Sequence, residues 1–162
     1  MAIRNPTDLP RAVPKGKRLL GLDLGTRTIG MAVCDPGLRL ATAVGTIRRL
    51  KLAEDLRALA RAVREWDAGG FVIGLPISMD GRHGPATDRV RSFGASLLQH
   101  ADLLGCEPEI AYWDERLSTH AATEAMIEAG MKRRRREELV DAVAAAHILQ
   151  SYLDALARDG AT

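Results

Sequence analysis

The chain has 162 residues, which is the size of one domain that buries a core without disulfides or a structural metal. Apolar residues make up 46% of the chain and aromatic residues 4%, so the composition excludes a disordered or fibrous protein and indicates an aliphatic interior. The formal charge of +2 decides nothing about a nucleic-acid partner, because only the placement of the charges bears on that question.

Cysteine usage and the N-terminal segment indicate where the protein works. Cys34 and Cys106 each stand alone, without a His at a metal-ligand spacing, which favours a reduced, cytoplasmic protein without a zinc site. Residues 1–16 hold three prolines and lack the apolar run of a signal peptide, and no stretch approaches the roughly 20 apolar residues of a membrane span. We therefore expect no membrane association, a flexible arm over 1–16, one folded domain over 17–158 and a tail over 159–162.

The first half of the folded domain predicts three consecutive strands. Short apolar runs cover residues 18–24, 29–34 and 39–47, and Gly, Asp and Pro residues separate them. Strand-forming runs joined by such turn residues are typical of an antiparallel meander.

A helix and a buried strand are expected next. From residue 52 to 66 apolar residues recur every three or four positions with charged residues between them, which predicts an amphipathic helix. Gly69 and Gly70 are expected to end that helix. The continuous apolar run over 71–73 is typical of a strand that is buried on both faces.

The second half alternates helices and strands. The pattern predicts a helix opened by Gly84 and Pro85 and reaching residue 104, a strand over 109–113, a short helix over 118–129 and a last helix over 137–158. Because alternating strands and helices form right-handed crossovers between parallel strands, we expect a mixed α/β sheet covered by helices.

Three carboxylates occur in apolar surroundings where a charge is costly without a partner or a role. Asp23 lies inside the first strand, and alternation places its side chain on the face opposite Leu22 and Leu24. Glu115 follows the strand over 109–113 directly, and Asp141 lies in the first turns of the last helix.

Each of these acids also has an ordinary structural interpretation. Asp23 could accept hydrogen bonds from Thr26 or Thr28, Glu115 could pair with Arg116, and Asp141 could favour a helix N-terminus. Taken together, the three form a ligand set for hard divalent cations, two of which can clamp a phosphodiester.

Four sequence strings closely resemble, in order, the bacterial YqgF family, also called RuvX. They are GLDLGTRTIG at 21–30, GLP at 74–76 with MDG at 79–81, DERLST at 114–119, and VDA at 140–142 with ILQSYL at 148–153. These proteins are RNase H-like nucleases, named both as Holliday junction resolvases and as pre-16S rRNA nucleases. The resemblance covers about residues 17 to 156 and is specific because all four strings occur together.

The resemblance implies an RNase H-like fold with a mixed five-stranded sheet flanked by helices. It also implies that Asp23, Glu115 and Asp141 match the family's acidic active-site positions, so we expect them to be catalytic and to bind Mg²⁺ or Mn²⁺. The implied reaction is phosphodiester hydrolysis, first in 5′-end processing of pre-16S rRNA and alternatively in the resolution of four-way DNA junctions. Symmetric resolution would require a homodimer.

Positively charged residues near these acids are candidates for phosphate contacts. Arg116 follows Glu115 directly, and Arg82 and His83 lie in the Gly-rich loop after residues 71–73. An unbroken basic run precedes the predicted last helix; it comprises Lys132, Arg133, Arg134, Arg135 and Arg136. Salt bridges and solvated surfaces are the commoner meanings of such residues, but the closeness of the run to Asp141 favours nucleic-acid backbone binding. The remaining histidines are interpreted as structural or surface residues: His100, His120 and His147.

Two other classes of function remain open from the sequence. Residues 23–26 also resemble the first phosphate loop of actin-like and Hsp70-like ATPases, which close two such domains around a nucleotide. This chain supplies one domain and no second phosphate loop, which ranks ATP binding low. A catalytically silent nucleic-acid-binding module is the third class, and only the presence of all three acids argues against it.

Overall fold

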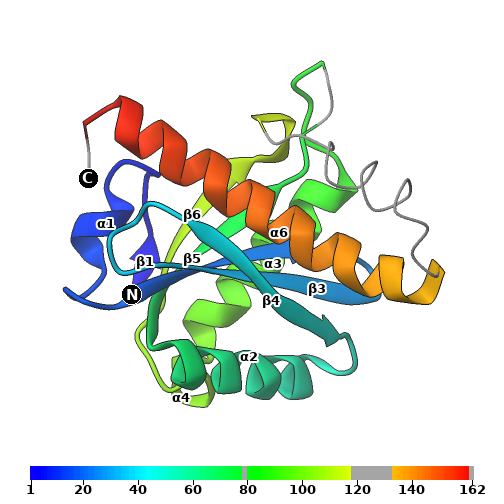
Figure 1. Ribbon diagram of the computed structural model, residues 1–162. Coiled ribbons are helices and arrows are strands. Elements are labelled where there is room, and N and C mark those ends of the chain that lie inside the picture. The colour runs from blue at the N-terminus through cyan, green and yellow to red at the C-terminus, as the bar shows by residue number, and fades with distance from the viewer. Residues whose placement is uncertain (78–79, 118–132, 161–162) are drawn as a thin grey trace.

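The computed structural model describes residues 1–77, 80–117 and 133–160 (Figure 1). In this part of the chain one sheet has six strands in the order β1-β6-β5-β2-β3-β4. Its elements are β1 (Ala2–Ile3), α1 (Leu9–Ala12), β2 (Arg18–Leu24), β3 (Thr28–Cys34), β4 (Ala41–Arg48), α2 (Leu52–Trp66), β5 (Ala68–Leu75), α3 (Pro85–Gln99), α4 (Ala101–Leu104), β6 (Glu109–Asp114), the short 3₁₀ helix η1 (Glu115–Leu117) and α6 (Arg133–Arg158).

Strand pairing confirms the predicted mixed sheet. β2 pairs antiparallel with β3, and β3 pairs antiparallel with β4, as expected for the meander. β5 lies parallel to both β2 and β6, because helical crossovers return the chain in the same direction. The count differs from the five strands that the resemblance implied, since β1 adds a short parallel strand beside β6.

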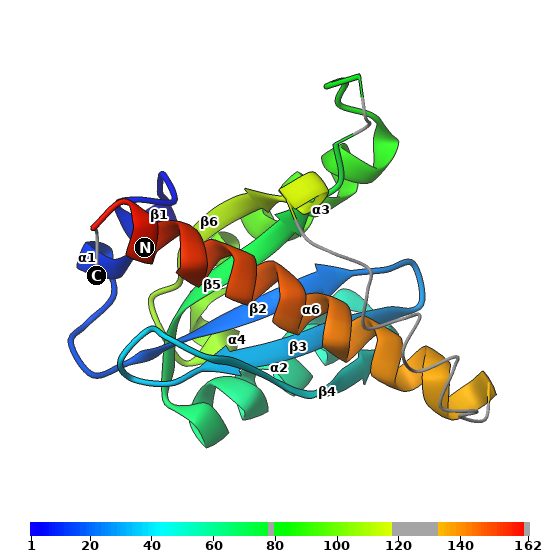
Figure 2. The same cartoon turned by 45° about the horizontal axis from the view of Figure 1, so that its top comes forward.

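Helices cover both faces of the sheet in two separate cores. Helix α6 crosses one face, while α2, α3 and α4 lie on the other (Figures 1 and 2). Alternation along β2 divides its side chains between the two layers: Leu20 and Leu22 pack with α2 and α3, and Leu19 packs with α6. Every residue of β5 is buried, which confirms a central strand covered on both faces. No helix within the described residues is long and apolar enough to cross a membrane.

Three predicted helix boundaries are wrong. Helix α2 ends at Trp66 with Asp67 in the left-handed conformation, whereas Gly69 and Gly70 lie within β5. A Cβ on Gly70 would lie 2.6 Å from a methyl carbon of Val13, so close packing, not helix termination, requires glycine there.

The two later boundary errors have local causes. The helix expected to reach Leu104 is interrupted at His100, whose ψ of 36° separates α3 from α4. Helix α6 begins at Arg133, so the arginines expected to precede the helix form its first turns, since arginine is a good helix former. The predicted helix over 118–129 lies outside the described residues.

The N-terminal segment differs from the flexible arm that the sequence predicts. Leu9 and Val13 are buried against β-sheet and α6 residues, and the hydroxyl of Tyr152 donates a 2.5 Å hydrogen bond to the carbonyl of Pro6. The terminal ammonium group and Arg4 lie 2.6 and 2.7 Å from the carboxylate of Glu109. The prolines do not prevent α1, because Pro10 occupies its first turn, where a missing N–H is tolerated.

This packing predicts that Leu9 contributes to the stability of the folded domain. Leu9 is 0% exposed, whereas Leu40 is 63% exposed. Leu9→Ala should lower the free energy of unfolding by about 2–4 kcal/mol, the usual cost of a buried leucine cavity, and Leu40→Ala should change it by less than about 0.5 kcal/mol. Urea denaturation measures both. Equal values for the two variants would mean that the segment detaches in solution.

Candidate active site

Asp23, Glu115 and Asp141 come together where β2 and β6 end beneath α6. Asp23 lies on the sheet face opposite Leu22 and Leu24, as predicted. This is the face that α6 covers, because Gly21 two residues earlier faces Leu149 of that helix. Glu115 begins η1 immediately after β6. A side-chain hydrogen bond joins Asp23 to Glu115, and the charge of Asp141 acts on Asp23 through space. Three distant parts of the sequence therefore supply one acidic cluster.

Glycines on the two neighbouring strands make room for this cluster. Gly30 of β3 pairs with Asp23, and a Cβ on Gly30 would lie only 1.8 Å from the carbonyl oxygen of Asp141. On the other side of β2, a Cβ on Gly74 of β5 would lie 2.8 Å from Oε1 of Glu115. At Gly30 the backbone of α6 leaves no room for a side chain, and at Gly74 a side chain would displace those of Glu115 and Ile148, so Asp23 is flanked by two closely packed glycines.

Thr28 holds one of the acids in place. Its hydroxyl donates a hydrogen bond to Oδ2 of Asp141, not to Asp23 as one interpretation of the sequence had it. Asp141 lies eight residues after Arg133, the start of α6, so the helix N-terminus interpretation of Asp141 is wrong. Its side chain is instead fixed by β3, on the strand next to Asp23.

The electrostatics of the cluster follow from burial and from like charges. Burial, the largest effect, acts together with the carboxylates of Glu115 and Asp141 to raise the pKa of Asp23 to about 7. Both effects disfavour the ionised form of Asp23. At neutral pH the cluster therefore needs a proton or a cation to balance its charge.

The donor chemistry of this cluster fits a hard divalent cation. Three carboxylates from β2, η1 and α6 provide only oxygen donors, which Mg²⁺ and Mn²⁺ prefer. A divalent cation would also replace the proton that offsets repulsion at Asp23. Among residues 1–77, 80–117 and 133–160, no three His, Cys, Asp or Glu side chains stand in the geometry of an assembled metal site. In this structure the hydroxyl of Thr28 contacts Asp141, and Asp23 and Glu115 share a hydrogen bond.

The structure brings three predicted phosphate-binding residues to one side of the cluster. Arg116 donates from Nε and Nη2 to Oδ2 of Asp114 at 2.9 and 2.6 Å, a pair that the sequence interpretation of Glu115 and Arg116 did not include. The charge of His83 lowers the pKa of Asp114, after the larger effect of Arg116. Arg82 lies 3.2 Å from Asp80 and is 86% exposed. The loop that carries Arg82 and His83 projects beside η1 (Figure 2).

The other predicted charged residues are placed less fully. The four arginines of the basic run belong to the first turns of α6, before Asp141: Arg133, Arg134, Arg135 and Arg136. Lys132 and His120 lie outside the described residues. His100 is a helix-end residue, with Nδ1 2.9 Å from the carbonyl oxygen of Ser96, in keeping with a structural role.

Comparisons with known proteins identify the family. A family model described as "RuvX: Holliday junction resolvase" matches residues 17–155. The chain belongs to the RuvX family. A Rhodospirillum centenum protein named "Putative pre-16S rRNA nuclease" is 55% identical over 156 residues, which cover 96% of this chain and 83% of that protein. A Paramagnetospirillum magneticum protein of the same name is 47% identical over 95% of this chain and 96% of its own length.

A solved structure shares the fold of this RuvX-family chain. Thermus thermophilus RuvC in complex with a Holliday junction substrate aligns with a TM-score of 0.50 and 17% identity, over 90% of this chain and 97% of that one. The RNase H-like α/β fold predicted from the sequence is thereby confirmed, and the family model and the relatives confirm the predicted family. Membership of a nuclease family makes the chain a hydrolase of phosphodiester bonds.

Sequence reasoning did not assign a role to Gly30 or Gly74, and it offered Thr28 only as a hydrogen-bond donor to Asp23. A signal for the two glycines was present, because a glycine inside a strand marks a close approach of other backbone. Which group approaches could not be deduced, since Asp141 is more than 100 residues from Gly30 in the chain. Thr28 is a surface-type residue whose partner likewise depends on the position of α6.

Close packing at Gly30 predicts a large effect of adding one methyl group. Gly30→Ala should destabilise the RuvX-family domain by about 2–3 kcal/mol, because the new Cβ would collide with the backbone of α6 and push Asp141 away. Gly84→Ser is the matched control, since Gly84 precedes α3 and a Cβ there meets nothing within 4 Å. Thermal unfolding compares the two. Wild-type stability in Gly30→Ala would show that α6 lies farther from the sheet.

The raised pKa of Asp23 predicts an inverse dependence of stability on pH. In the folded protein Asp23 keeps its proton up to about pH 7, but in the unfolded chain only to about pH 3.9. The folded state therefore binds the extra proton between these values, and its stability falls as pH rises through this window. In excess chelator, Asp23→Asn should remove this contribution and be more stable than wild type above pH 7. Asp154 is an exposed acid on α6, and the control variant Asp154→Asn should retain the wild-type dependence of stability on pH.

Proposed function

We propose that this chain is a divalent-metal-dependent nuclease whose catalytic residues are Asp23, Glu115 and Asp141 and whose substrate is the 5′ leader of pre-16S rRNA. The observation that carries the proposal is the convergence of the three carboxylates from separate elements, with the pKa of Asp23 raised to about 7. Like charges gathered at such a cost are typical of functional sites. We also propose that the protein works in the bacterial cytoplasm, where its proposed RNA substrate is found.

The proposed mechanism divides the work among the residues of the cluster. Asp23, Glu115 and Asp141 would hold Mg²⁺ or Mn²⁺, which when bound lowers the pKa of a water and stabilises the leaving oxygen. Release of the Asp23 proton near pH 7 supplies the charge that such a cation requires. Thr28 orients the carboxylate of Asp141 through its hydroxyl, and Gly30 allows that carboxylate to approach Asp23.

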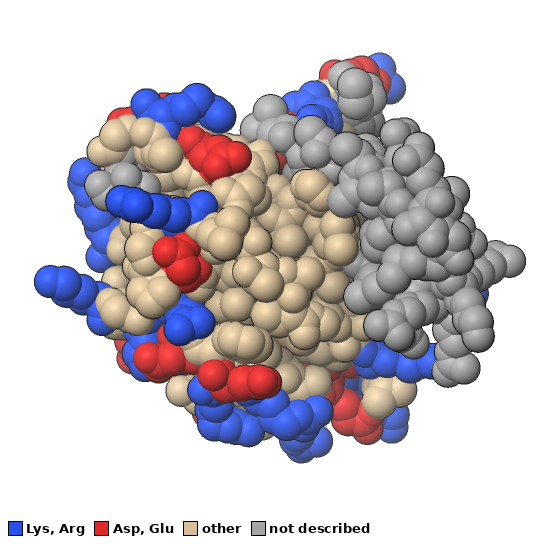
Figure 3. All heavy atoms as spheres, viewed as in Figure 1, with Lys and Arg blue, Asp and Glu red and all other residues tan. Residues whose placement is uncertain are grey.

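Substrate binding is assigned to positive groups beside the cluster. Arg116, held by Asp114, and the neighbouring Arg82 and His83 are proposed to contact backbone phosphates. Contacts of this kind position a nucleic acid without reading its bases. On the face that Figure 3 shows, the described Lys and Arg side chains lie around the rim, interspersed with Asp and Glu side chains, and the binding path is proposed to follow that rim. The basic run from Lys132 to Arg136 is proposed to extend this path.

The choice of RNA rests on the named relatives. Proteins 55% and 47% identical to this chain are named as pre-16S rRNA nucleases, whereas the RuvC structure shares the fold alone. Resolution of four-way DNA junctions is the second candidate, favoured by the description of the matching family model. That activity would add a requirement for two copies of the chain, one for each cut strand.

Neutral replacements of the acids test the proposed site. We expect a loss of cleavage rate of at least about 100-fold in each of Asp23→Asn, Glu115→Gln and Asp141→Asn. Loss of a residue that only supports a metal ligand costs about 10- to 100-fold, and loss of a direct ligand should cost at least as much. Substrate affinity should change little, and the control Asp154→Asn on the same helix should cleave normally. Wild-type cleavage by any acid variant would remove that residue from the site, and full cleavage in excess chelator would refute the metal requirement.

A direct comparison of substrates tests the proposed specificity. The purified protein is given a 16S precursor RNA with its 5′ leader and, separately, a four-way DNA junction, each with Mg²⁺ or Mn²⁺. Cleavage of the RNA but not the junction supports leader processing. Paired symmetric cuts in the junction with an intact RNA would reverse the choice.

A further inference from the structure

Arg49 connects the turn beside the acidic cluster to the opposite layer of the protein. It follows the last residue of β4 and its side chain is 26% exposed. Its Nη1 donates a 2.9 Å hydrogen bond to the carbonyl of Gly25, and its backbone N–H donates a 2.8 Å hydrogen bond to the carbonyl of Arg27. Both acceptors belong to the turn between β2 and β3, so Arg49 is hydrogen-bonded to that turn through its side chain and through its backbone.

This turn lies between Asp23 and Thr28, the residue that orients Asp141. β2 enters it just after Asp23, and β3 leaves it at Thr28, whose hydroxyl donates to Asp141. Within the turn the N–H of Gly25 donates a 2.8 Å hydrogen bond to the carbonyl of Thr28. A shift of the turn would therefore move Asp23 and the hydroxyl that holds Asp141 together.

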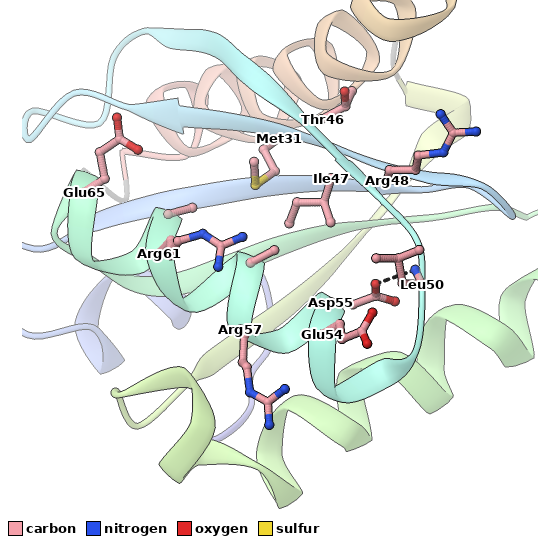
Figure 4. Close-up of a pocket in the computed structure, with 12 residues that line it drawn as sticks. Met31, Thr46, Ile47, Arg48, Leu50, Glu54, Asp55, Arg57, Arg61 and Glu65 are labelled. Atoms are coloured by element: carbon pink, nitrogen blue, oxygen red, sulfur yellow. Dashed lines mark hydrogen bonds between the residues drawn. The ribbon is translucent and has the colours of Figure 1, made fainter.

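The guanidinium of Arg49 is itself fixed by buried groups. Its Nε lies 3.7 Å from Oδ2 of Asp55, whose side chain is 2% exposed, and its centre lies 5.9 Å from the centre of the Phe93 ring. Asp55 is held in turn, because its Oδ1 accepts a 2.8 Å hydrogen bond from the N–H of Leu50, two residues before α2 begins (Figure 4). The turn is thus braced against a buried carboxylate.

The geometry at Arg49 requires an arginine. A planar guanidinium has separate N–H groups that can face Gly25 and Asp55 at once, whereas a lysine ammonium is a single point charge on a flexible chain. Lysine would keep the charge opposite Asp55 and much of the contact with Phe93. The replacement therefore removes the side-chain hydrogen bond to Gly25, keeps the backbone hydrogen bond to Arg27 and has little effect on the buried pair.

We propose that Arg49 is a positioning residue of the nuclease site, acting through the Gly25–Thr28 turn on the cation affinity of Asp23 and Asp141. The inference rests on the proposed function, since it takes these acids as the cation ligands. Arg49 touches none of the reacting groups, and its effect passes through the hydroxyl of Thr28. A purely structural role for the Arg49–Asp55 pair would instead lower stability and leave cation affinity unchanged.

The test measures Mn²⁺ binding to the full chain by calorimetry. Arg49→Lys should raise the Kd for Mn²⁺ about tenfold, the usual effect of losing an outer-shell partner, and hydrogen exchange at the Gly25 amide should accelerate by at least about tenfold as the turn loosens. Thr28→Val should weaken Mn²⁺ binding similarly, and Thr28→Ser, which keeps the hydroxyl, should restore it. Arg57→Lys, exposed on α2, is the matched control and should behave as wild type.

A double variant distinguishes coupling from independent damage. If Arg49 acts through Thr28, Arg49→Lys with Thr28→Val should bind Mn²⁺ no more than about twofold more weakly than the worse single variant. A Kd equal to the product of the two single effects would overturn the proposed route. Wild-type affinity and wild-type Gly25 exchange in Arg49→Lys would overturn the role of Arg49 altogether.

These measurements separate this inference from the proposed function. Mn²⁺ affinity and amide exchange need no nucleic acid, so a wild-type protein that binds Mn²⁺ but cuts neither RNA nor junction would refute the nuclease assignment and leave the role of Arg49 standing. A wild-type protein that binds no Mn²⁺ would refute both. For active protein, Arg49→Lys should lower kcat about tenfold with KM for the nucleic acid within about twofold, because the phosphate contacts lie elsewhere.

Discussion

Helix α6 lies so close to the sheet that the carbonyl oxygen of Asp141 occupies the space where a side chain on Gly30 would begin. Helices and sheets usually pack through interleaved side chains, and direct backbone contact is possible only where a strand carries glycine. Gly21 and Gly74 extend the same arrangement along α6, toward Leu149 and Ile148. The acidic cluster depends on this contact, because Asp141 reaches the level of Asp23 only when its helix rests on the sheet.

Close packing of the elements also explains the electrostatic state of the cluster. Strand alternation places Asp23 under α6, where water is largely excluded, and the turn into η1 brings Glu115 to the same point. Burial and two like charges then act in one direction on Asp23, whereas the nearby, partly buried Asp114 has an arginine partner that lowers its pKa. The domain thus places unbalanced negative charge at one site and pairs it elsewhere.

Support for the site comes from both layers of the protein. On the α6 side the N-terminal segment buries Leu9 and receives a hydrogen bond from Tyr152, which extends the core that holds α6 in place. On the other side Asp55 and Arg49 brace the turn that ends β2. Asp23 and Glu115 lie near the ends of β2 and β6, and Asp141 lies within α6; these buried contacts give all three elements defined positions.

The sequence by itself determined the element types, the family and the identity of the acids. Hydrophobic periodicity is a local property, so the meander, α2, β5 and β6 were predictable, and strand alternation was enough to place Asp23 on the correct face. Tertiary structure decided what the acids touch. Thr28 contacts Asp141, Arg116 pairs with Asp114, and Arg49 holds Gly25. The N-terminal segment also packs because α6 and Glu109 offer it partners. Such contacts join residues up to 146 positions apart, and they follow from how layers pack, which no local pattern encodes.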